Sequence, residues 1–344
     1  MILNGRDPTP LYWNESDYIQ KERQFAARTA KAMATIDILG VTHNYELTPS
    51  VSCSSAPTLI FIHGWLLSRN YWQPLTDRLS ADYQCLTYDL RGFGESQPVS
   101  SLNSTNYSAR FNEDAQYPIK ENHEPSPYSL AAYAQDLVIL LEKLNITNAW
   151  LVGHSLGGSI ALWGADCCPE RVKGVICLNS GGGIYLKEEF TRFRMFGKQL
   201  VQLRLPWLPC LPGMARLFSR AMVHKPLERK WGKQRVIDFV QADTEAALGS
   251  LLDSTTEAEV HLLPQIVARL KGPVYFLAGE QDMIMELKYV RHLASFHWLF
   301  HPQGGNIVEI PDCGHLSMLE QTENVTAAIA EILRKETTRP SVTA

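Results

Sequence analysis

Short apolar runs recur along the chain, and each is bounded by turn residues. The runs are continuous rather than alternating, which is typical of strands covered on both faces in a parallel sheet. The strongest are Leu59–Ile62, Ala149–Val152, Val175–Leu178 and Val274–Ala278. Weaker strands of the same set are predicted at Tyr83–Tyr88 and Ile307–Ile310, and Val41–Leu47 can form a first strand.

Between these strands the apolar spacing becomes helical. The clearest helix carries its apolar face on Leu130, Tyr133, Leu137, Leu140, Leu141 and Leu144. Alternating strands and helices predict an α/β fold, with a mostly parallel central sheet and helices on both faces. From Asp17 to about Ile38 the chain is rich in Ala, Lys and Arg, so we expect residues 1–40 to form a helical extension.

Two segments interrupt this alternation. Residues 97–127 are polar, rich in Ser, Asn and Pro, and longer than an ordinary connection, which predicts a flap or a functional loop. Residues 183–263 are mostly helical and separate two strand candidates. We expect this second segment to be a helical cap inserted into a core made of residues 41–182 and 264–336.

Charge is distributed unevenly along the 344 residues. The formal net charge is -4, so the whole chain offers no basic field for nucleic acid. Between Gly183 and Arg235, however, there are 12 Lys or Arg and only 3 Asp or Glu. The rest of the chain contains 20 Lys or Arg and 33 Asp or Glu. The cap is therefore basic, and the body is acidic.

The seven cysteines are odd in number and show no metal-ligand spacing, which predicts buried thiols in a reducing compartment. No apolar run approaches the roughly 20 residues that cross a bilayer, and the segment after Met1 is polar. We therefore expect a cytoplasmic protein, either soluble or bound to a membrane surface. No metal or other cofactor is expected, and the oligomeric state stays open.

A serine lies where an apolar strand meets an Ala-rich helix, in the sequence WLVGHSLGGS at residues 150–159. Gly153 and Gly157 flank Ser155 at minus two and plus two, where a sharp strand-to-helix turn leaves little room for larger side chains. Such a turn exposes the hydroxyl and directs the helix N-terminus at developing negative charge. An ordinary serine at a helix start is the alternative.

This pattern resembles the α/β-hydrolase family, and further motifs follow in the same order from about Thr58 to Arg334. The sequence FIHGW at residues 61–65 resembles the family's His-Gly oxyanion motif, and DLRGFGES at 89–96 resembles a structural turn. The resemblance implies a serine esterase or lipase-like branch with a cap. It also implies that the backbone N–H groups of Trp65 and Leu156 stabilise the oxyanion.

The same resemblance gives Ser155 its partners. LAGEQD at residues 277–282 ends in Asp282, where the family keeps its acid, and DCGH at 312–315 resembles its histidine loop. Glu280 and Asp312 are competing acids, but Asp312 is too near His315 in sequence to face its far ring nitrogen. His63 and His154 are expected to stabilise loops, and Asn179 is discounted because it is not an acid.

The resulting hypothesis is a serine hydrolase of apolar carboxylic esters, lipid-like or of the isoprenoid or phytyl type. His315 would remove the proton of Ser155, and Asp282 would orient the imidazole. The same site could instead transfer acyl groups, form peracids without a cofactor, or cleave a carbon–carbon bond next to a carbonyl. A non-catalytic or slow ligand receptor is the alternative from another class.

Apolar and aromatic residues of the cap are interleaved with Arg and Lys. We expect the substrate to contact Trp65 of the core and four residues of the cap, Phe193, Phe196, Trp207 and Leu208. The same composition also suits an interfacial segment among anionic headgroups, so peripheral membrane contact through the cap is the alternative.

Overall fold

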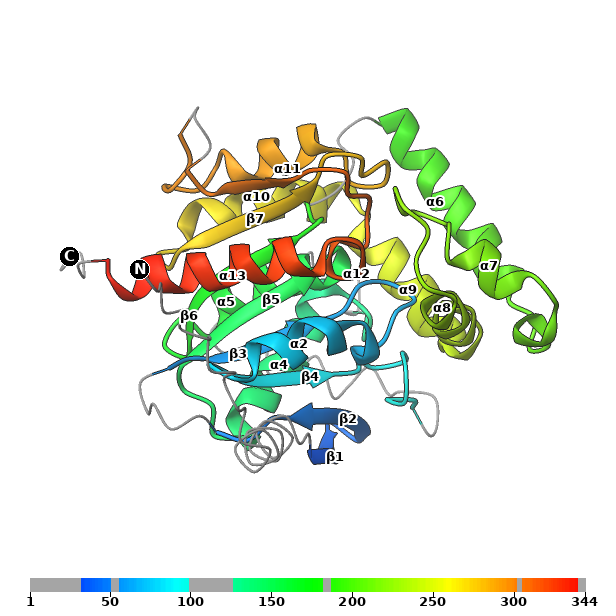
Figure 1. The fold of residues 1–344 in the computed structure, drawn as a ribbon, viewed down its shortest axis with the longest axis horizontal. Coiled ribbons are helices and arrows are strands. Elements are labelled where there is room, and N and C mark those ends of the chain that lie inside the picture. Colours follow the sequence, from blue (N-terminus) through cyan, green and yellow to red (C-terminus); the bar gives the residue numbers. More distant parts are fainter. Residues whose placement is uncertain (1–31, 51–55, 99–125, 182–186, 302–304, 340–344) are drawn as a thin grey trace, which may run out of the picture.

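A computed structural model describes residues 32–50, 56–98, 126–181, 187–301 and 305–339. Within these residues one eight-stranded sheet has the order β1-β2-β4-β3-β5-β6-β7-β8 (Figure 1). The strands are β1 (Ala32–Ile38), β2 (Val41–Leu47), β3 (Thr58–Ile62), β4 (Gln84–Tyr88), β5 (Ala149–His154), β6 (Val172–Leu178), β7 (Val274–Gly279) and β8 (Ile307–Ile310). Strands β3 to β8 run parallel, whereas β2 is antiparallel to β4 and to β1. The predicted mostly parallel sheet is confirmed.

Helices cover both faces of the sheet, because successive strand residues point to opposite sides. Ile60 and Ile62 belong to the hydrophobic core on one face, and Leu59 and Phe61 to the core on the other. The first core contains residues of α4 (Leu130–Lys143), α5 (Leu156–Cys167), α10 (Glu257–Arg269) and α11 (Leu287–Ala294). The second contains residues of η1 (Arg69–Trp72), α2 (Gln73–Leu79), α12 (Ser317–Glu320) and α13 (Thr322–Thr337).

The prediction of a helix up to Ile38 is wrong for residues 32–38, which form β1. The strand pairs with β2 through a tight hairpin in which Leu39 and Gly40 both have positive φ, 51° and 84°. Such a two-residue turn matches the twist of the two strands. Polar Thr35 and Asp37 alternate with apolar neighbours, a strand signal that the Ala-rich composition obscured. Residues 1–31 of the predicted extension lie outside the described residues.

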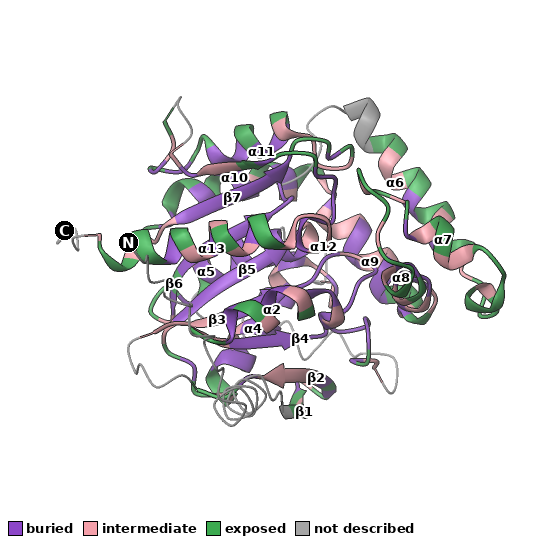
Figure 2. Cartoon of the chain, in the orientation of Figure 1, coloured by how far each residue is buried: buried purple, intermediate pink, exposed green. Residues whose placement is uncertain are grey.

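The insertion is helical, as expected. It consists of α6 (Lys187–Gln202), η2 (Leu208–Cys210), α7 (Met214–Phe218), α8 (Arg229–Gln241) and α9 (Thr244–Ser254). The predicted boundary at residue 263 falls inside α10, which packs on α5. In Figure 2, α6 and α7 lie at the edge of the molecule, and most of their described residues are exposed or half-buried. The predicted flap at 97–127 lies outside the described residues except at its ends.

Candidate active site

Ser155 stands at a sharp turn between β5 and α5. Its backbone has φ 51° and ψ −116°, a conformation that non-glycine residues rarely adopt. A Cβ on Gly153 would lie 2.2 Å from the carbonyl oxygen of Gly157, and one on Gly157 would lie 2.2 Å from that of Ile62. Both neighbours must therefore be glycine. The turn leaves Ser155 half-buried rather than fully buried.

His315 and Asp282 form a buried pair beyond two different strands of the sheet. Nδ1 of His315 lies 2.8 Å from Oδ2 of Asp282. Burial alone would raise the pKa of Asp282, but the His315 charge and several hydrogen bonds hold it below its usual range. An ionised carboxylate only accepts hydrogen bonds, so Nδ1 of His315 is the nitrogen that donates to Asp282. In the neutral imidazole the unprotonated nitrogen is then Nε2, as the predicted role of a base requires.

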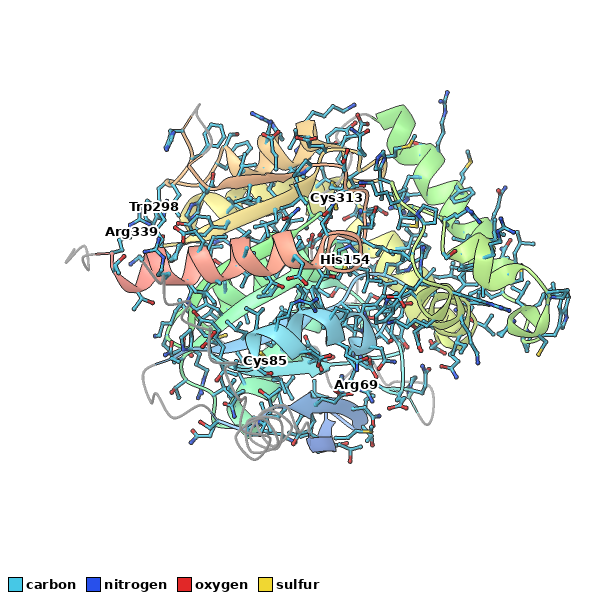
Figure 3. The ribbon with its side chains drawn as sticks, in the orientation of Figure 1. Arg69, Cys85, His154, Trp298, Cys313 and Arg339 are labelled. Carbon is cyan, nitrogen blue, oxygen red and sulfur yellow. The ribbon has the colours of Figure 1, made fainter. Side chains whose placement is uncertain are left out.

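His154 connects the turn of Ser155 to the loop of His315. Its Nε2 donates to the carbonyl oxygen of His315 at 2.7 Å, and the two rings lie 4.8 Å apart between centroids. Burial is the main reason that the pKa of His154 falls to about 3, so this ring is neutral. Figure 3 shows His154 near the centre of the molecule, beside the loop that leads into α12. The expected loop-stabilising role of this histidine fits these contacts.

Asn179 was discounted from sequence because it is not an acid, yet it contacts the proposed acid directly. Its Nδ2 donates to Oδ2 of Asp282 at 2.9 Å and to the carbonyl oxygen of Gly314 at 3.1 Å. The backbone N–H groups of Ile284 and Met285 bind the other carboxylate oxygen at 2.8 and 2.9 Å. The only sequence signal for a role of Asn179 at the site was its position at the end of β6, on the same sheet edge as Ser155.

Glu320 is a second residue that sequence reasoning missed. Its carboxylate accepts from the N–H groups on either side of His315, those of Gly314 and Leu316, both at 3.1 Å. It also accepts from the N–H of His224 in the cap at 2.7 Å. The N–H of His315 itself donates to the carbonyl oxygen of Met222 at 3.0 Å. The histidine loop is therefore tied to the cap by one backbone hydrogen bond and by the carboxylate of Glu320.

The loop after β3 lies against the turn of Ser155. A Cβ on Gly64 would lie 2.7 Å from Nδ1 of His154, so glycine allows this close approach. The next residue, Trp65, is half-buried, and its indole N–H donates to the carbonyl oxygen of Ala247 in α9 at 2.9 Å. Leu156 is the first residue of α5, and the first turn of a helix leaves N–H groups without helical partners. The assignment of the backbone N–H groups of Trp65 and Leu156 as oxyanion donors stays a prediction.

Asp238 of α8 ties the cap to this loop. One carboxylate oxygen accepts from Oγ of Ser68 at 3.0 Å, and the other accepts from Nε2 of Gln234 at 3.0 Å. Burial raises the pKa of Asp238 to about 6, although these hydrogen bonds act in the opposite direction. The folded protein therefore binds a proton more tightly here than the unfolded chain does.

This shift predicts a specific effect of Asp238→Asn on stability. Between pH 6 and 4 the folded wild type takes up the proton first, so this group adds stability as the pH falls. Asparagine does not titrate and lacks this contribution. The free energy of unfolding of the variant, minus that of wild type, should therefore be more positive at pH 7.5 than at pH 4.5, by on the order of 2 kcal/mol. Urea unfolding of both proteins at both pH values measures this difference. A stability difference that is independent of pH would contradict the shift.

The cap residues predicted to contact substrate separate into two groups. Phe193 is half-buried, and half-buried Leu208 packs against the larger core. Phe196 and Trp207 are instead 63% and 51% exposed. Their predicted contact with substrate stays a prediction. For Phe196 the reason is the direction of α6, because Gly197 on the inward side of this helix packs against Leu251. Trp207 lies beyond α6, directly before η2.

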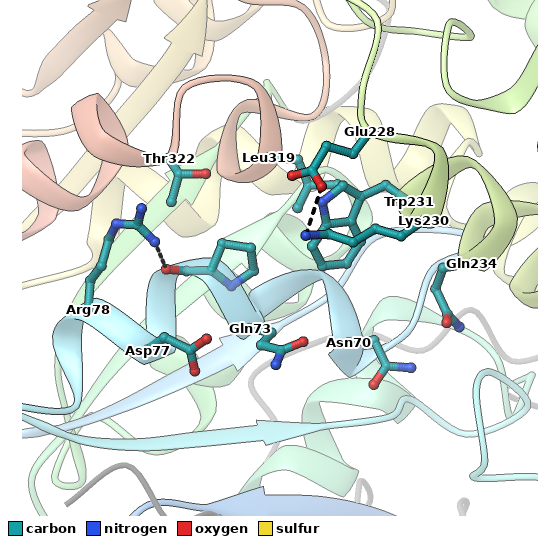
Figure 4. A pocket seen from close by; sticks show the side chains of 11 residues that line it. Asn70, Gln73, Asp77, Arg78, Glu228, Lys230, Trp231, Gln234, Leu319 and Thr322 are labelled. Atoms are coloured by element: carbon teal, nitrogen blue, oxygen red, sulfur yellow. Dashed lines mark hydrogen bonds and ion pairs between the residues drawn. The ribbon is translucent and has the colours of Figure 1, made fainter. Parts of the chain in front are cut away.

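A polar hollow of about 720 Å³ lies elsewhere, between α2, α8 and the start of α13 (Figure 4). It is lined by Asn70, Gln73, Pro74, Asp77, Arg78, Glu228, Lys230, Trp231, Gln234, Leu319 and Thr322, which do not include the proposed catalytic residues. Within the described part of the chain, no three His, Cys, Asp or Glu side chains gather as a metal site.

Comparisons with known proteins agree with this architecture. A 2-succinyl-6-hydroxy-2,4-cyclohexadiene-1-carboxylate synthase of Enterobacter sp. (strain 638) is 29% identical over 302 residues, which cover 81% of this chain and 92% of that protein. A pimeloyl-[acyl-carrier protein] methyl ester esterase of Pseudoalteromonas atlantica is 22% identical over 282 residues, or 78% and 92% of the two chains.

Among solved structures, a thermophilic esterase from Thermogutta terrifontis superposes with a TM-score of 0.63 at 23% identity. The superposition covers 89% of this chain and 98% of the esterase, and it therefore supports the shared fold. Residues 57–322 also match the sequence profile of the alpha/beta hydrolase fold. Because this match covers most of the chain, the protein belongs to the α/β-hydrolase fold family.

Proposed function

We propose that this α/β hydrolase is a serine-dependent esterase of apolar carboxylic esters. The observation that carries the proposal is the turn at Ser155, with its φ of 51°. The residue before it, His154, donates to the carbonyl oxygen of His315, and the imidazole of His315 is bound to the buried carboxylate of Asp282. A strained turn is maintained only where the surrounding structure requires it, and such strain is concentrated at functional sites. The esterase among the relatives is consistent with the same chemistry.

Each proposed residue has one chemical task. Nε2 of His315 takes the hydroxyl proton as Ser155 attacks the carbonyl carbon, and the tetrahedral oxyanion forms beside the N–H groups of Trp65 and Leu156. The proton then passes to the departing alcohol, and an acyl group remains on Ser155. Water, deprotonated by His315, releases the acid and restores the serine. Asp282 keeps the imidazole in one tautomer and offsets its positive charge.

The surroundings of this centre favour an apolar substrate. Half-buried Trp65 and Leu156, whose backbones are the proposed oxyanion donors, both pack against the larger hydrophobic core. Leu208 and Phe218 of the cap and Met285 beyond Asp282 are half-buried against the same core. Lipid-like or isoprenoid acyl chains suit such a lining better than small polar esters.

Covalent labelling tests the proposal directly. A fluorophosphonate should label the wild type at Ser155, as peptide mapping would identify, and should not label Ser155→Ala. The wild type should also hydrolyse p-nitrophenyl esters, with kcat/KM increasing from acetyl to longer acyl chains because each buried methylene adds about 0.8 kcal/mol.

The alternatives give different results in the same assays. A folded protein whose Ser155 resists the reagent would favour a ligand receptor and contradict the proposal. Ester formation that outpaces hydrolysis when an alcohol is added would identify an acyltransferase. Labelling without turnover of any ester, but with cleavage of a carbon–carbon bond next to a ketone, would instead identify a C–C hydrolase.

A further inference from the structure

Large apolar side chains are exposed on the outside of the cap, on α6, η2, α7 and the segments between them. Phe196, Leu203, Trp207 and Leu217 are each at least half exposed. We call the exposed side chains between Arg192 and Met222 the outer cap surface. Large apolar side chains that are exposed close together are uncommon on a free protein and mark an interaction site.

The outer cap surface is distinct from the side of the cap that packs on the rest of the molecule. On α6, Arg192, Phe196 and Leu203 follow one another at helical spacing and are all exposed. Gly197 and Val201 lie on the opposite side and are buried, and a Cβ on Gly197 would lie 2.5 Å from Leu251 of α9. The side of α6 that carries Arg192, Phe196 and Leu203 is therefore the one turned away from α9, and Figure 2 shows exposed residues along this helix.

The charge of this segment is of one sign. Residues 191–227 contain seven Lys or Arg and no Asp or Glu. Arg194 and Arg204 bind backbone carbonyl groups, and Lys225 pairs with Asp312. The remaining four basic side chains have no acidic partner among the residues that the structure describes. These four are Arg192, Lys198, Arg216 and Arg220.

We propose that the outer cap surface docks on an anionic lipid bilayer. Exposed Trp, Phe and Leu among unpaired Arg and Lys are the combination that inserts apolar groups at the headgroup boundary and attracts acidic lipids. Self-association through this surface is disfavoured, because a symmetric dimer would bring the same basic side chains together. The proposed contact is peripheral, through side chains at the headgroup boundary. No described helix is long and apolar enough to cross a bilayer.

The outer cap surface is continuous with the loop that carries His315. Met222, itself 46% exposed, accepts the hydrogen bond from the N–H of His315. Two and three residues further on, His224 and Lys225 donate their N–H groups to Glu320 at 2.7 and 3.3 Å. A docked cap would therefore hold the proposed catalytic centre next to the bilayer. The docking itself does not depend on ester hydrolysis.

Vesicle co-sedimentation of the full chain tests the docking. The probes are phosphatidylcholine vesicles with and without about 30% phosphatidylglycerol, at about 50 mM and 500 mM NaCl. We expect at least roughly tenfold stronger partitioning onto the anionic vesicles at low salt, and a loss of most of this advantage at high salt. Catalytic activity plays no part in this readout, so failure of docking and failure of the proposed esterase are distinguishable.

Two tryptophans with the same exposure provide matched variants. Trp207 lies in the outer cap surface, and Trp298 lies far from the cap; both are 51% exposed. Trp207→Ser should weaken partitioning about fivefold or more, and Trp298→Ser should leave it unchanged. The combined variant Lys198→Glu, Arg216→Glu, Arg220→Glu should lower partitioning by at least about tenfold and remove its dependence on salt.

Several results would overturn the docking proposal. These are absence of binding to anionic vesicles, equal binding to neutral ones, and an effect of Trp298→Ser as large as that of Trp207→Ser. A dimer in light scattering that Trp207→Ser dissociates, with no vesicle binding, would assign the surface to a second copy instead. Circular dichroism of each variant shows whether a loss of binding reflects a loss of fold.

Discussion

Ser155→Ala is expected to lower kcat for ester hydrolysis by roughly 10⁴- to 10⁶-fold while the protein stays folded. The hydroxyl is the proposed nucleophile, and its loss removes the acyl-enzyme route altogether. Its removal should not unfold the helix, because the Ser155 side chain makes no capping hydrogen bond to α5. Steady-state kinetics on the best ester of the chain-length series measure the effect, and circular dichroism with thermal unfolding measures the fold.

The same kinetics on His315→Ala and on the double variant test whether the two residues act together. Each single change should abolish most of the catalysis, and combining them should add little, because neither group works without the other. Additive losses in the double variant would show that they act independently. A near-normal rate in either single variant would refute the assignment of that residue.

Asp282→Asn is expected to lower kcat by about 10⁴-fold with little change in KM. An asparagine amide can donate where the carboxylate only accepts, so His315 can turn or change tautomer and lose its free Nε2. The hydrogen bond that Asn179 donates to this carboxylate would also lose its charged acceptor. Measurement of kcat and KM separately distinguishes this effect from weaker substrate binding.

Asp312→Asn is the matched control for this change. Asp312 is close to His315 in sequence, but its carboxylate is exposed and pairs with Lys225 at 3.2 Å. Its φ of 51° is tolerated by asparagine as well as by aspartate. We therefore expect a rate within about twofold of wild type, since an exposed ion pair contributes at most about 1 kcal/mol. Equal losses in Asp282→Asn and Asp312→Asn would contradict the choice of Asp282.

The sequence by itself determined where the parallel strands lie along the chain and which elements bear the candidate residues. Continuous apolar runs and Gly-flanked turns are local signals, and they predicted β3 and β5 to β8 to within three residues at either end. The same local signals placed Ser155, Asp282 and His315 after three strands of one sheet. Parallel strands end at a common edge, so the meeting of these segments followed from the fold class.

Only the tertiary structure decided how side chains are directed and which distant groups they meet. Phe196 and Trp207 turned outward because contacts with α9 and the core occupy the inner side of the cap. Asn179 and Glu320 gained their roles from Asp282 and from the His315 loop. The pattern of a segment fixes which positions share a face, but the neighbour that this face meets is fixed by packing of the whole chain.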